Sequence, residues 1–250
     1  MPRVMTIVTL LSDFGTADSY VAEMKAVLLS RKADLTVVDI THEISPGDVR
    51  AGQYLLSRSW KYFPRSTIHV AVIDPGVGTE RRAIAAESEG HRFLAPDNGL
   101  LSFLPAEARF VSILVPPDAS PTFHGRDVFA PAAATLASGD PIDALGSSVS
   151  RPVRAPLPVP HRDGTTIIGE VIYVDRFGTL ISNIVPAAVE AGVRIRVGDV
   201  DVGPLQRTFA DAARGALVAF TGSGGTVEIS VRDGSAARLL GVGVGAEVRA

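Results

Sequence analysis

The chain contains 250 residues, of which 46% are hydrophobic and 20% charged, and its formal net charge is −3. These values are typical of a soluble globular protein with a sizeable core. They disfavour a disordered chain and a nucleic-acid-binding protein with a basic face. Cysteine is absent, which excludes disulfides, thiolate metal sites and a cysteine nucleophile.

The N-terminal stretch before Ser12 contains an apolar run of only about seven residues, which is too short to span a membrane. It also lacks the cleavage pattern of a signal peptide. We therefore expect a cytoplasmic enzyme or binding protein that acts without a membrane or nucleic-acid partner.

The first half of the chain alternates between predicted strands and helices. Apolar runs and apolar periodicity predict strands at 4–11, 35–40, 67–73, 92–95 and 110–115, and helices at 20–31, 51–60 and 127–138. Strands that are apolar on both faces and alternate with helices predict an α/β domain with a mainly parallel central sheet flanked by helices.

The second half changes character. Residues 151–164 carry four prolines and no clear periodicity, which predicts an interdomain linker. Short β-type runs separated by glycines follow at 166–174, 194–197, 216–220 and 226–231. This spacing predicts a smaller, antiparallel β-barrel-like domain. The expected organisation is an N-terminal α/β domain at 1–150, the linker, and a C-terminal β domain at 165–250.

Two polar clusters, SDFG and DPGVGTERR, follow predicted strands. Ligands of α/β domains bind beyond the carboxyl ends of the strands, so Asp13 and Asp74 are expected to face one crevice. The second cluster lacks the glycine patterns of phosphate loops, and its aspartate would repel a phosphate. Two interpretations stay open. Asp74 with Arg81 or Arg82 is directed at a small polar reactant, or the loop is a type II turn with solvated arginines.

His124 lies in the segment TFHGRDVFAP, directly before a predicted helix. A loop that combines histidine, arginine and aspartate is a suitable place for a general base. The alternative is that Arg126 and Asp127 form a capping pair and His124 is incidental. The five histidines form no i,i+4 pair, so no metal site is expected. His69 is interpreted as a structural residue of an apolar strand.

Three further stretches contain ligand-like side chains. PDNGLLSFL presents Asp97 and Asn98, either for a turn or for contacts to ligand hydroxyls. YVDRFGTLISN places Asp175 at a strand end, with Phe177 and Asn183 nearby. TGSGG either supplies backbone N–H groups to a carboxylate or forms an ordinary hairpin connection.

The order of these segments is more specific than any one of them. LSDFGTADSYVAEMKAV, VVDITHEISPGDVRAGQYLL, AVIDPGVGTERR, APDNGLLS, FHGRDVFAP, IYVDRFGTLISN and TFADA extend through nearly the whole chain. Together they resemble the S-adenosyl-L-methionine (SAM) hydroxide adenosyltransferases, relatives of the bacterial fluorinase and chlorinase. The resemblance implies an N-terminal α/β domain, a C-terminal β domain and a homotrimer. It places the active site between the N-terminal domain of one subunit and the C-terminal domain of its neighbour.

The resemblance also implies a reaction, in which water splits SAM at C5′ of the ribose to give adenosine and methionine without a cofactor. The Asp–Arg–His triad of the family corresponds to Asp74, Arg81 and His124. The halogenating relatives carry a tyrosine at the position of Asp74, and the fluorinase carries a halide-binding serine at the position of Gly125. The chain therefore resembles the hydroxide branch.

Substrate contacts of the family are matched by Asp13 for the ribose diol, by Asp18, Asp175 and Ser223 for the methionine part, and by Phe177 and Phe209 for the adenine. Three positions depart from the family pattern, one of them Thr226, which stands where the family usually has a bulky residue after the TGSGG loop. Thr179 stands where the family usually has an asparagine that contacts adenine. Gly224 stands where the fluorinase has an arginine for the methionine carboxylate.

The chemistry agrees with these residue types. A sulfonium leaves as a neutral thioether, so its departure needs no general acid, whereas water, with a pKa of about 15.7, must be activated. A base such as His124, or a water oriented by Asp74 and polarised by Arg81, meets this need. Two alternatives to hydrolysis stay open: halide adenosyl transfer, which Asp74 disfavours, and SAM or adenosine binding without turnover.

Overall fold

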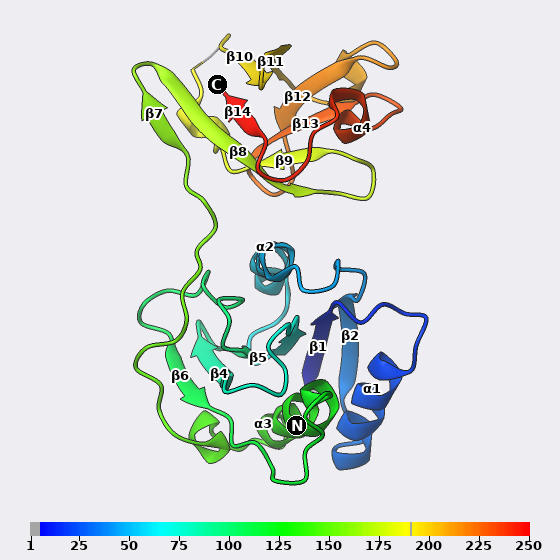
Figure 1. Cartoon of the computed structure of the whole chain (residues 1–250), viewed down its shortest axis with the longest axis vertical. Helices are drawn as coiled ribbons and strands as arrows, with labels where there is room; N and C mark the ends of the chain where they lie inside the picture. The colour runs from blue at the N-terminus through cyan, green and yellow to red at the C-terminus, as the bar shows by residue number, and fades with distance from the viewer. Residues whose placement is uncertain (1–5, 191) are drawn as a thin grey trace. The chain divides into compact units, whose positions relative to one another are not determined.

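The computed structural model describes residues 6–190 and 192–250. The chain forms two compact units, Met1–Pro156 and Leu157–Ala250, each with its own sheet (Figure 1). The boundary lies within the proline-rich segment. The first residues of this segment bind the N-terminal unit, because the backbone N–H of Val153 donates to the Asp97 carboxylate (2.7 Å).

The N-terminal unit is built on a six-stranded sheet with the order β2-β1-β3-β5-β4-β6. Its strands are β1 (Ile7–Ser12), β2 (Thr36–Thr41), β3 (Ile68–Val72), β4 (Ala83–Ser88), β5 (His91–Pro96) and β6 (Arg109–Ser112). Strand β1 is parallel to β2 and β3, and β3 is parallel to β5, whereas β4 is antiparallel to β5 and β6. The predicted α/β class with a mainly parallel sheet is confirmed. Residues 4 and 5 of the first predicted strand lie outside the described residues.

Strand β4 is missing from the sequence prediction. Its sequence, AIAAES, consists mainly of alanine and polar residues, which have a weak preference for strands. The strand forms because a tight turn at Glu89 and Gly90, both with left-handed φ angles (50° and 81°), folds it back against β5. Pairing with β5, rather than the strand preference of its own residues, therefore determines that this segment forms a strand.

Helices α1 (Tyr20–Arg31) and α3 (Ala130–Ala137) pack on one face of the sheet. Met24 and Leu28 of α1 and Leu136 of α3 share a buried core with strand residues that include Val8 and Val70. The apolar stripe predicted for 20–31 is the face that is buried, because side chains three and four residues apart lie on the same side of a helix.

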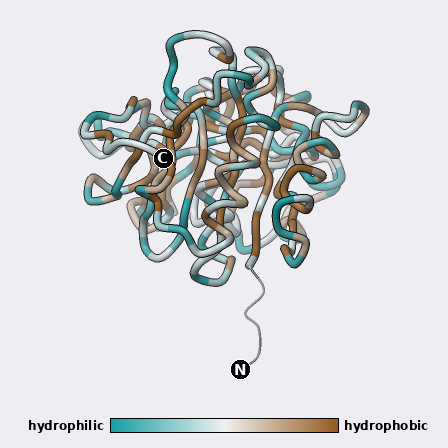
Figure 2. The backbone as a smooth tube through the Cα atoms, turned by 90° about the horizontal axis from the view of Figure 1, so that it is seen from below, coloured by the Kyte–Doolittle hydropathy of each residue, from teal (hydrophilic) through white to brown (hydrophobic). Residues whose placement is uncertain are grey.

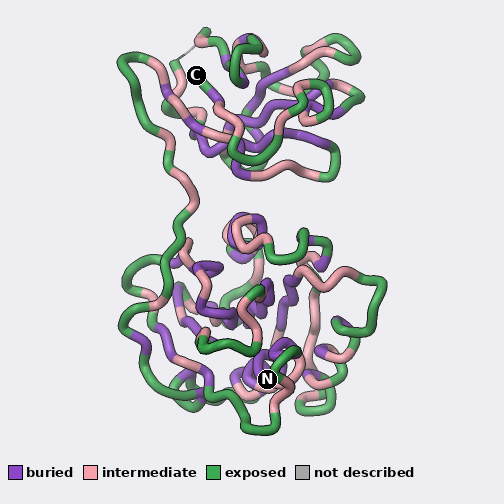
Figure 3. Tube along the Cα trace, viewed as in Figure 1, coloured by how far each residue is buried: buried purple, intermediate pink, exposed green. Residues whose placement is uncertain are grey.

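Helix α2 (Val49–Ser59) begins two residues before its predicted start and continues into the short turn η1 (Trp60–Tyr62). The earlier start follows from Asp48, whose carboxylate accepts a hydrogen bond from the N–H of Ala51 (2.9 Å) and so caps the helix. The chain trace is hydrophobic and buried in the strands and on the inner helix faces, and hydrophilic and exposed in many connecting loops (Figures 2 and 3).

Buried histidines lie on the other face of this sheet. His69 on β3 is bonded through Nδ1 to the hydroxyl of Thr9 (2.8 Å), and its Nε2 lies 3.2 Å from Nδ1 of His91. Trp60 packs against His91, with ring centroids 5.0 Å apart. Burial, followed by the charge of His91, lowers the pKa of His69 to about 3. His69 is therefore a structural residue, as predicted.

We expect the N-terminal unit to lose stability in mild acid because of His69. The pKa of this ring is near 6.5 in an unfolded chain and about 3 in the folded one, so the unfolded chain binds the proton first. The contribution to stability is complete above pH 6.5 and is lost as the pH falls toward 3, by up to about 1.4 kcal/mol per pH unit.

Urea unfolding followed through Trp60, the single tryptophan, measures this loss. Between pH 7 and pH 5 the wild type should lose about 2 kcal/mol of unfolding free energy that His69→Gln does not lose. His161→Gln, at an exposed histidine, should behave like the wild type. Equal losses in the wild type and His69→Gln would contradict this role of His69.

The C-terminal unit is a small barrel. Its strands are β7 (His161–Asp163), β8 (Thr166–Val174), β9 (Leu180–Ser182), β10 (Arg194–Val197), β11 (Val200–Gln206), β12 (Leu217–Thr221), β13 (Val227–Val231) and β14 (Glu247–Arg249). Strand β14 pairs with β10 at one end of the strand order and with β8 near the other, which closes the sheet. The predicted barrel-like domain is confirmed, although β11 and β12 are parallel rather than antiparallel. A short helix, α4 (Ala236–Leu240), follows β13.

Candidate active site

The loop after β3 carries the predicted aspartate and both arginines. The carbonyl of Asp74 accepts a hydrogen bond from the N–H of Val77 (3.2 Å), which closes a tight turn. Gly76 has no positive φ, so the alternative interpretation of this loop as a type II turn is wrong. The positive φ (77°) occurs at Gly78, where a Cβ atom would lie 2.6 Å from the carbonyl oxygen of Pro121. The loop is therefore in close contact with the segment that precedes His124.

Arg81 joins Asp74 to His124. Its Nε donates to Oδ1 of Asp74 (2.8 Å), and its Nη2 contacts both Oδ2 of Asp74 and Nδ1 of His124, the latter at 3.0 Å. The side chains of Asp74 and Arg81 are only 5% and 10% exposed. The ring of Phe129 lies over the guanidinium, 5.7 Å from Cζ to the ring centroid. The structure thus brings the three predicted catalytic residues together.

Arg82 has different partners. Its guanidinium binds the carboxylate of Asp97, with Nε 2.8 Å from Oδ2, and donates to the carbonyl of Arg151 (2.8 Å). Asn98 donates to the carbonyl of Ile73 (2.8 Å). Asp97 and Asn98 are therefore engaged in contacts within the N-terminal unit, and Arg81 rather than Arg82 contacts His124.

The hydrogen bond from Arg81 assigns the tautomer of His124. A guanidinium has only donors, so Nδ1 of His124 is the unprotonated acceptor and the hydrogen of the neutral ring lies on Nε2. Burial, followed by the positive charge of Arg81, holds the pKa of His124 below its usual value. His124 is therefore neutral at pH 7 and presents an Nε2–H donor.

Asp74 and His124 line a cavity of about 710 Å³ at the carboxyl ends of the parallel strands. Its lining consists of Asp13, Phe14, Tyr20, Pro46, Gly47, Val72, Asp74, Pro75, Val77, Ser120, Thr122, Phe123, His124, Gly125 and Arg126. Arg81 is not part of this lining, so it supports Asp74 and His124 from outside the cavity wall. The volume is in the range of small-molecule sites.

Two domain profiles together match most of the chain. The SAM hydroxide adenosyltransferase N-terminal domain matches residues 8–146, and the C-terminal domain of the same family matches residues 169–249. The chain belongs to the SAM hydroxide adenosyltransferase family.

Relatives of this adenosyltransferase include the (R)-S-adenosyl-L-methionine hydrolase of Thermus thermophilus, which is 43% identical over 98% of this chain and 99% of that protein. A fluorinase from Actinoplanes is more distant, at 30% identity over 83% of this chain and 84% of the fluorinase. The crystal structure of an uncharacterized conserved protein from Thermotoga maritima superposes with a TM-score of 0.89 at 34% identity. This match covers 97% of this chain and 98% of that one.

Two predicted substrate-binding residues of the adenosyltransferase follow β1. Asp13 lines the cavity, and its Oδ2 accepts a hydrogen bond from the N–H of Gly47 (2.8 Å), in the loop after β2. Asp18 is exposed and is not part of the cavity lining. The structure therefore brings Asp13 to the triad and leaves Asp18 at the surface.

Four predicted substrate-binding residues of the adenosyltransferase lie on loops and turns of the β unit. Oδ1 of Asp175 accepts hydrogen bonds from the N–H groups of Phe177 and Thr179 (both 2.9 Å). Phe177 is 72% exposed, and Phe209 is 45% exposed and packs on Phe220 with ring centroids 4.3 Å apart. Ser223 is exposed in the loop between β12 and β13. Their substrate roles stay predictions.

Asn183 and Thr179 are both engaged inside the barrel. The carboxamide of Asn183 accepts from the N–H of Glu170 and donates to the carbonyl of Pro158, both at 2.9 Å. The buried hydroxyl of Thr179 lies 3.2 Å from that of Ser230. Thr179 therefore holds the barrel at the position where the family usually has an adenine contact, and a substrate role for Asn183 stays a prediction.

An aromatic wall of the cavity was missed by the sequence analysis. It consists of Phe14, Tyr20 and Phe123, whose ring centroids lie 5.2–5.8 Å apart. About a hundred residues separate Phe123 from the other two, so no local pattern predicts the cluster. Within the described residues, no group of three metal-ligating side chains occurs and no helix is long and apolar enough to cross a membrane.

Proposed function

We propose that this protein hydrolyses SAM at the ribose C5′ carbon to give adenosine and L-methionine. A water oxygen bonds to C5′ as the C5′–S bond breaks, the electron pair of that bond stays on sulfur, and one water proton is released. The observation that carries the proposal is the Asp74–Arg81–His124 triad at the wall of the cavity. The Thermus relative that bears the hydrolase name supports it.

The tautomer of His124 suggests how the triad divides the work. The Nε2–H group donates to the attacking water, while a free lone pair of the Asp74 carboxylate accepts one of the water protons. Arg81 holds both groups and keeps Nδ1 of His124 occupied. In this arrangement Asp74 takes the proton and His124 orients the oxygen, because Nε2 of His124 already carries a hydrogen and its other ring nitrogen, Nδ1, is occupied by the hydrogen bond from Arg81.

The charge of the cavity suits a cationic substrate. The cavity lining contains two carboxylates, those of Asp13 and Asp74, and one guanidinium, that of Arg126. A net negative surrounding attracts a sulfonium ion and repels halide ions. When the oxygen attacks, the charge on sulfur is annihilated, so the partly apolar wall favours the transition state.

The hydroxide branch is favoured over halide transfer by Gly125 as well as by Asp74. A Cβ atom at Gly125 would lie 3.1 Å from Sδ of Met24 and 3.2 Å from ring carbons of Phe14 and Phe123. A serine, the halide-binding residue of the fluorinase, therefore fits only if this wall moves. SAM or adenosine binding without turnover remains the second candidate.

The remaining parts of the proposal concern the assembly. We propose a cytoplasmic homotrimer without a metal or cofactor, in which the β domain of one subunit completes the cavity of its neighbour. The exposed aromatic rings of Phe177 and Phe209 support this, because they suit stacking on an adenine. Light scattering of the purified protein should give three times the 26.2 kDa chain mass.

Incubation with SAM in ¹⁸O-labelled water tests the reaction. We expect label in the 5′-hydroxyl of adenosine and none in methionine, because the oxygen bonds to C5′. Adenosine without label, or a halogenated nucleoside formed in chloride or fluoride, would rule out water attack at C5′. Measurable adenosine binding without any product would favour the binding module.

A further inference from the structure

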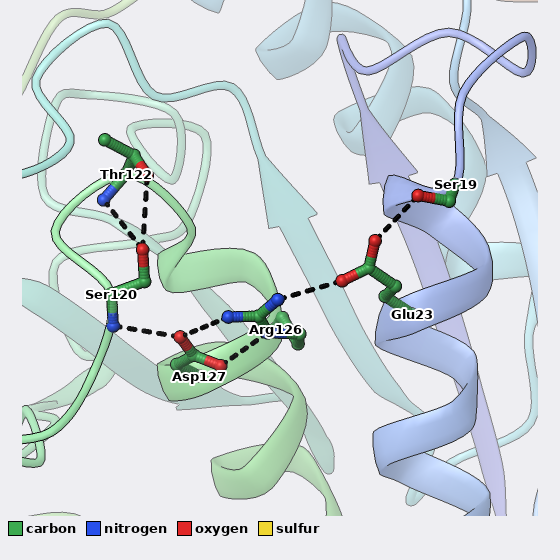
Figure 4. A network of polar contacts seen from close by, with 6 residues as sticks. All are labelled: Ser19, Glu23, Ser120, Thr122, Arg126 and Asp127. Atoms are coloured by element: carbon green, nitrogen blue, oxygen red, sulfur yellow. Dashed lines mark hydrogen bonds and ion pairs between the residues drawn. The ribbon is translucent and has the colours of Figure 1, made fainter.

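A chain of polar contacts connects the N-terminal end of α1 with η2 and the loop before it (Figure 4), and it includes the cavity-lining residues Ser120 and Arg126. Arg126 donates from Nε and Nη2 to the two oxygens of Asp127 (2.7 and 2.9 Å) and from Nη1 to Glu23 on α1 (2.9 Å). Asp127 also accepts from the N–H of Ser120 (2.9 Å). The hydroxyl of Ser19 donates to Glu23 (2.7 Å). We call Glu23, Arg126 and Asp127 the Arg126 clamp.

The clamp ties together three segments that form the cavity wall. Glu23 lies on α1, whose first residue, Tyr20, belongs to the aromatic wall. Ser120 lies in the loop before His124. Arg126 and Asp127 lie in η2 (Gly125–Phe129), one turn of π-helix. Such turns interrupt regular helix geometry and are frequent at functional sites.

The clamp acts next to the reacting groups. The guanidinium of Arg126 lies over the ring of Phe123, 4.9 Å from Cζ to the centroid. The backbone N–H groups of Arg126 and Asp127 both donate to the carbonyl of Phe123 (3.2 and 3.1 Å). His124 and Gly125 are enclosed between these anchored residues. The clamp residues are therefore anchored on both sides of the backbone segment that carries His124.

The same clamp also reaches the other side of the triad. It holds Ser120, and the next residue, Pro121, is the one whose carbonyl closely approaches Gly78. Gly78 belongs to the loop that carries Asp74 and Arg81. The clamp is thus connected to both halves of the triad through short, directly contacting segments.

The contribution of the clamp to stability is small. Glu23, Arg126 and Asp127 keep 37%, 35% and 21% of their side chains exposed, and exposed ion pairs contribute little to folding. The effect of the clamp on the positions of the reacting groups is larger, because a misplacement of about 1 Å can lower a rate by about 10²-fold. We propose that Arg126 is a positioning residue that holds His124 and the aromatic wall in register with Asp74 and Arg81. This inference rests on the proposed SAM hydrolysis.

The pH dependence of turnover gives a readout that a purely structural role would not move. The charged groups that face His124 are Arg81, Asp74 and Asp127. Its pKa is held down by burial first and by Arg81 second. If the clamp loosens, the His124 ring becomes more exposed to solvent and moves away from Arg81, so the pKa of His124 rises. The acidic limb of the kcat profile then moves to higher pH.

The test compares Arg126→Lys with Arg109→Lys in the full-length protein. Lysine keeps the charge but cannot bind Asp127 with two parallel hydrogen bonds and reach Glu23 as well. Arg109 is the matched control, since it is an arginine of the same unit, half exposed, with two carboxylate neighbours, Glu87 and Asp143.

We expect Arg126→Lys to lower kcat by about 10- to 100-fold and to move the acidic limb upward, while KM for SAM changes less than about threefold. Glu23→Gln should lower kcat and move the acidic limb upward by smaller amounts, and Arg109→Lys should leave kcat and the acidic limb unchanged. The melting temperature of all three variants should stay close to that of the wild type.

Three outcomes would overturn the inference: an unchanged kcat and pH limb in Arg126→Lys, an equal change in Arg109→Lys, or a rise in KM alone, which would assign Arg126 to substrate binding. Wild-type protein that does not cleave SAM would instead refute the proposed function, so the two failures are distinguishable.

Discussion

Replacement of Asp74 by asparagine is expected to lower kcat for SAM cleavage by about 10³-fold, within the range that general acid–base groups contribute. The change removes the carboxylate that we propose as the acceptor of the water proton, and with it the charge that pairs with Arg81. Adenosine affinity should change by less than about tenfold, because Asp13, the predicted ribose contact, is untouched. Single-turnover kinetics and adenosine titration measure the two quantities.

Loss of a buried ion pair also costs stability, about 3–5 kcal/mol when one partner is removed. Asp97→Asn is the matched control, because Asp97 is a buried carboxylate paired with the neighbouring arginine, Arg82, outside the cavity. It should destabilise the protein by less, because Arg82 is 45% exposed, while the turnover of the folded fraction is retained. If Asp74→Asn loses adenosine binding as severely as turnover, its catalytic role is wrong.

Variants of His124 should show whether this residue acts as a hydrogen-bond donor or as the acceptor of the water proton. His124→Ala is expected to lower kcat by about 10²- to 10⁴-fold. His124→Gln should recover part of this loss, because its amide places an N–H donor near the position of Nε2 but cannot take up a proton. Rates as low as those of His124→Ala in the glutamine variant would instead identify His124 as the base.

The pH profile of the wild type provides a second check on His124. Only the neutral ring accepts the hydrogen bond from Arg81, so activity requires the deprotonated form. Burial and Arg81 lower the pKa of His124 from 6.5. We therefore expect kcat to stay level as the pH falls to 6.5 and to decrease only in more acidic solution. In Arg81→Met the decrease should begin at higher pH, because the nearby positive charge is gone. An acidic limb that stays in place would contradict this coupling.

Segments with a strong local helix or strand pattern were predicted correctly from the sequence, and segments with a weak pattern were not. The amphipathic pattern at 20–31 coincides with α1, and the β-branched run at 166–174 coincides with β8. Strand β4 was missed because alanine carries little strand preference and only its pairing partner decides it. The helix predicted at 127–138 begins instead with the π turn η2, since apolar periodicity does not distinguish i→i+5 from i→i+4 hydrogen bonds.

The sequence by itself determined the family, the two-domain fold class and the identities of Asp74, Arg81 and His124, because these depend on motif order and on local periodicity. Only the tertiary structure showed that Arg81 contacts both Asp74 and His124 while Arg82 binds Asp97, that the Asp74 turn is not type II, and that Nδ1 of His124 is an acceptor. The physical reason is distance along the chain. Arg81 and His124 are 43 positions apart, and the hydrogen bond between them forms only when β3, its loop and η2 are packed together.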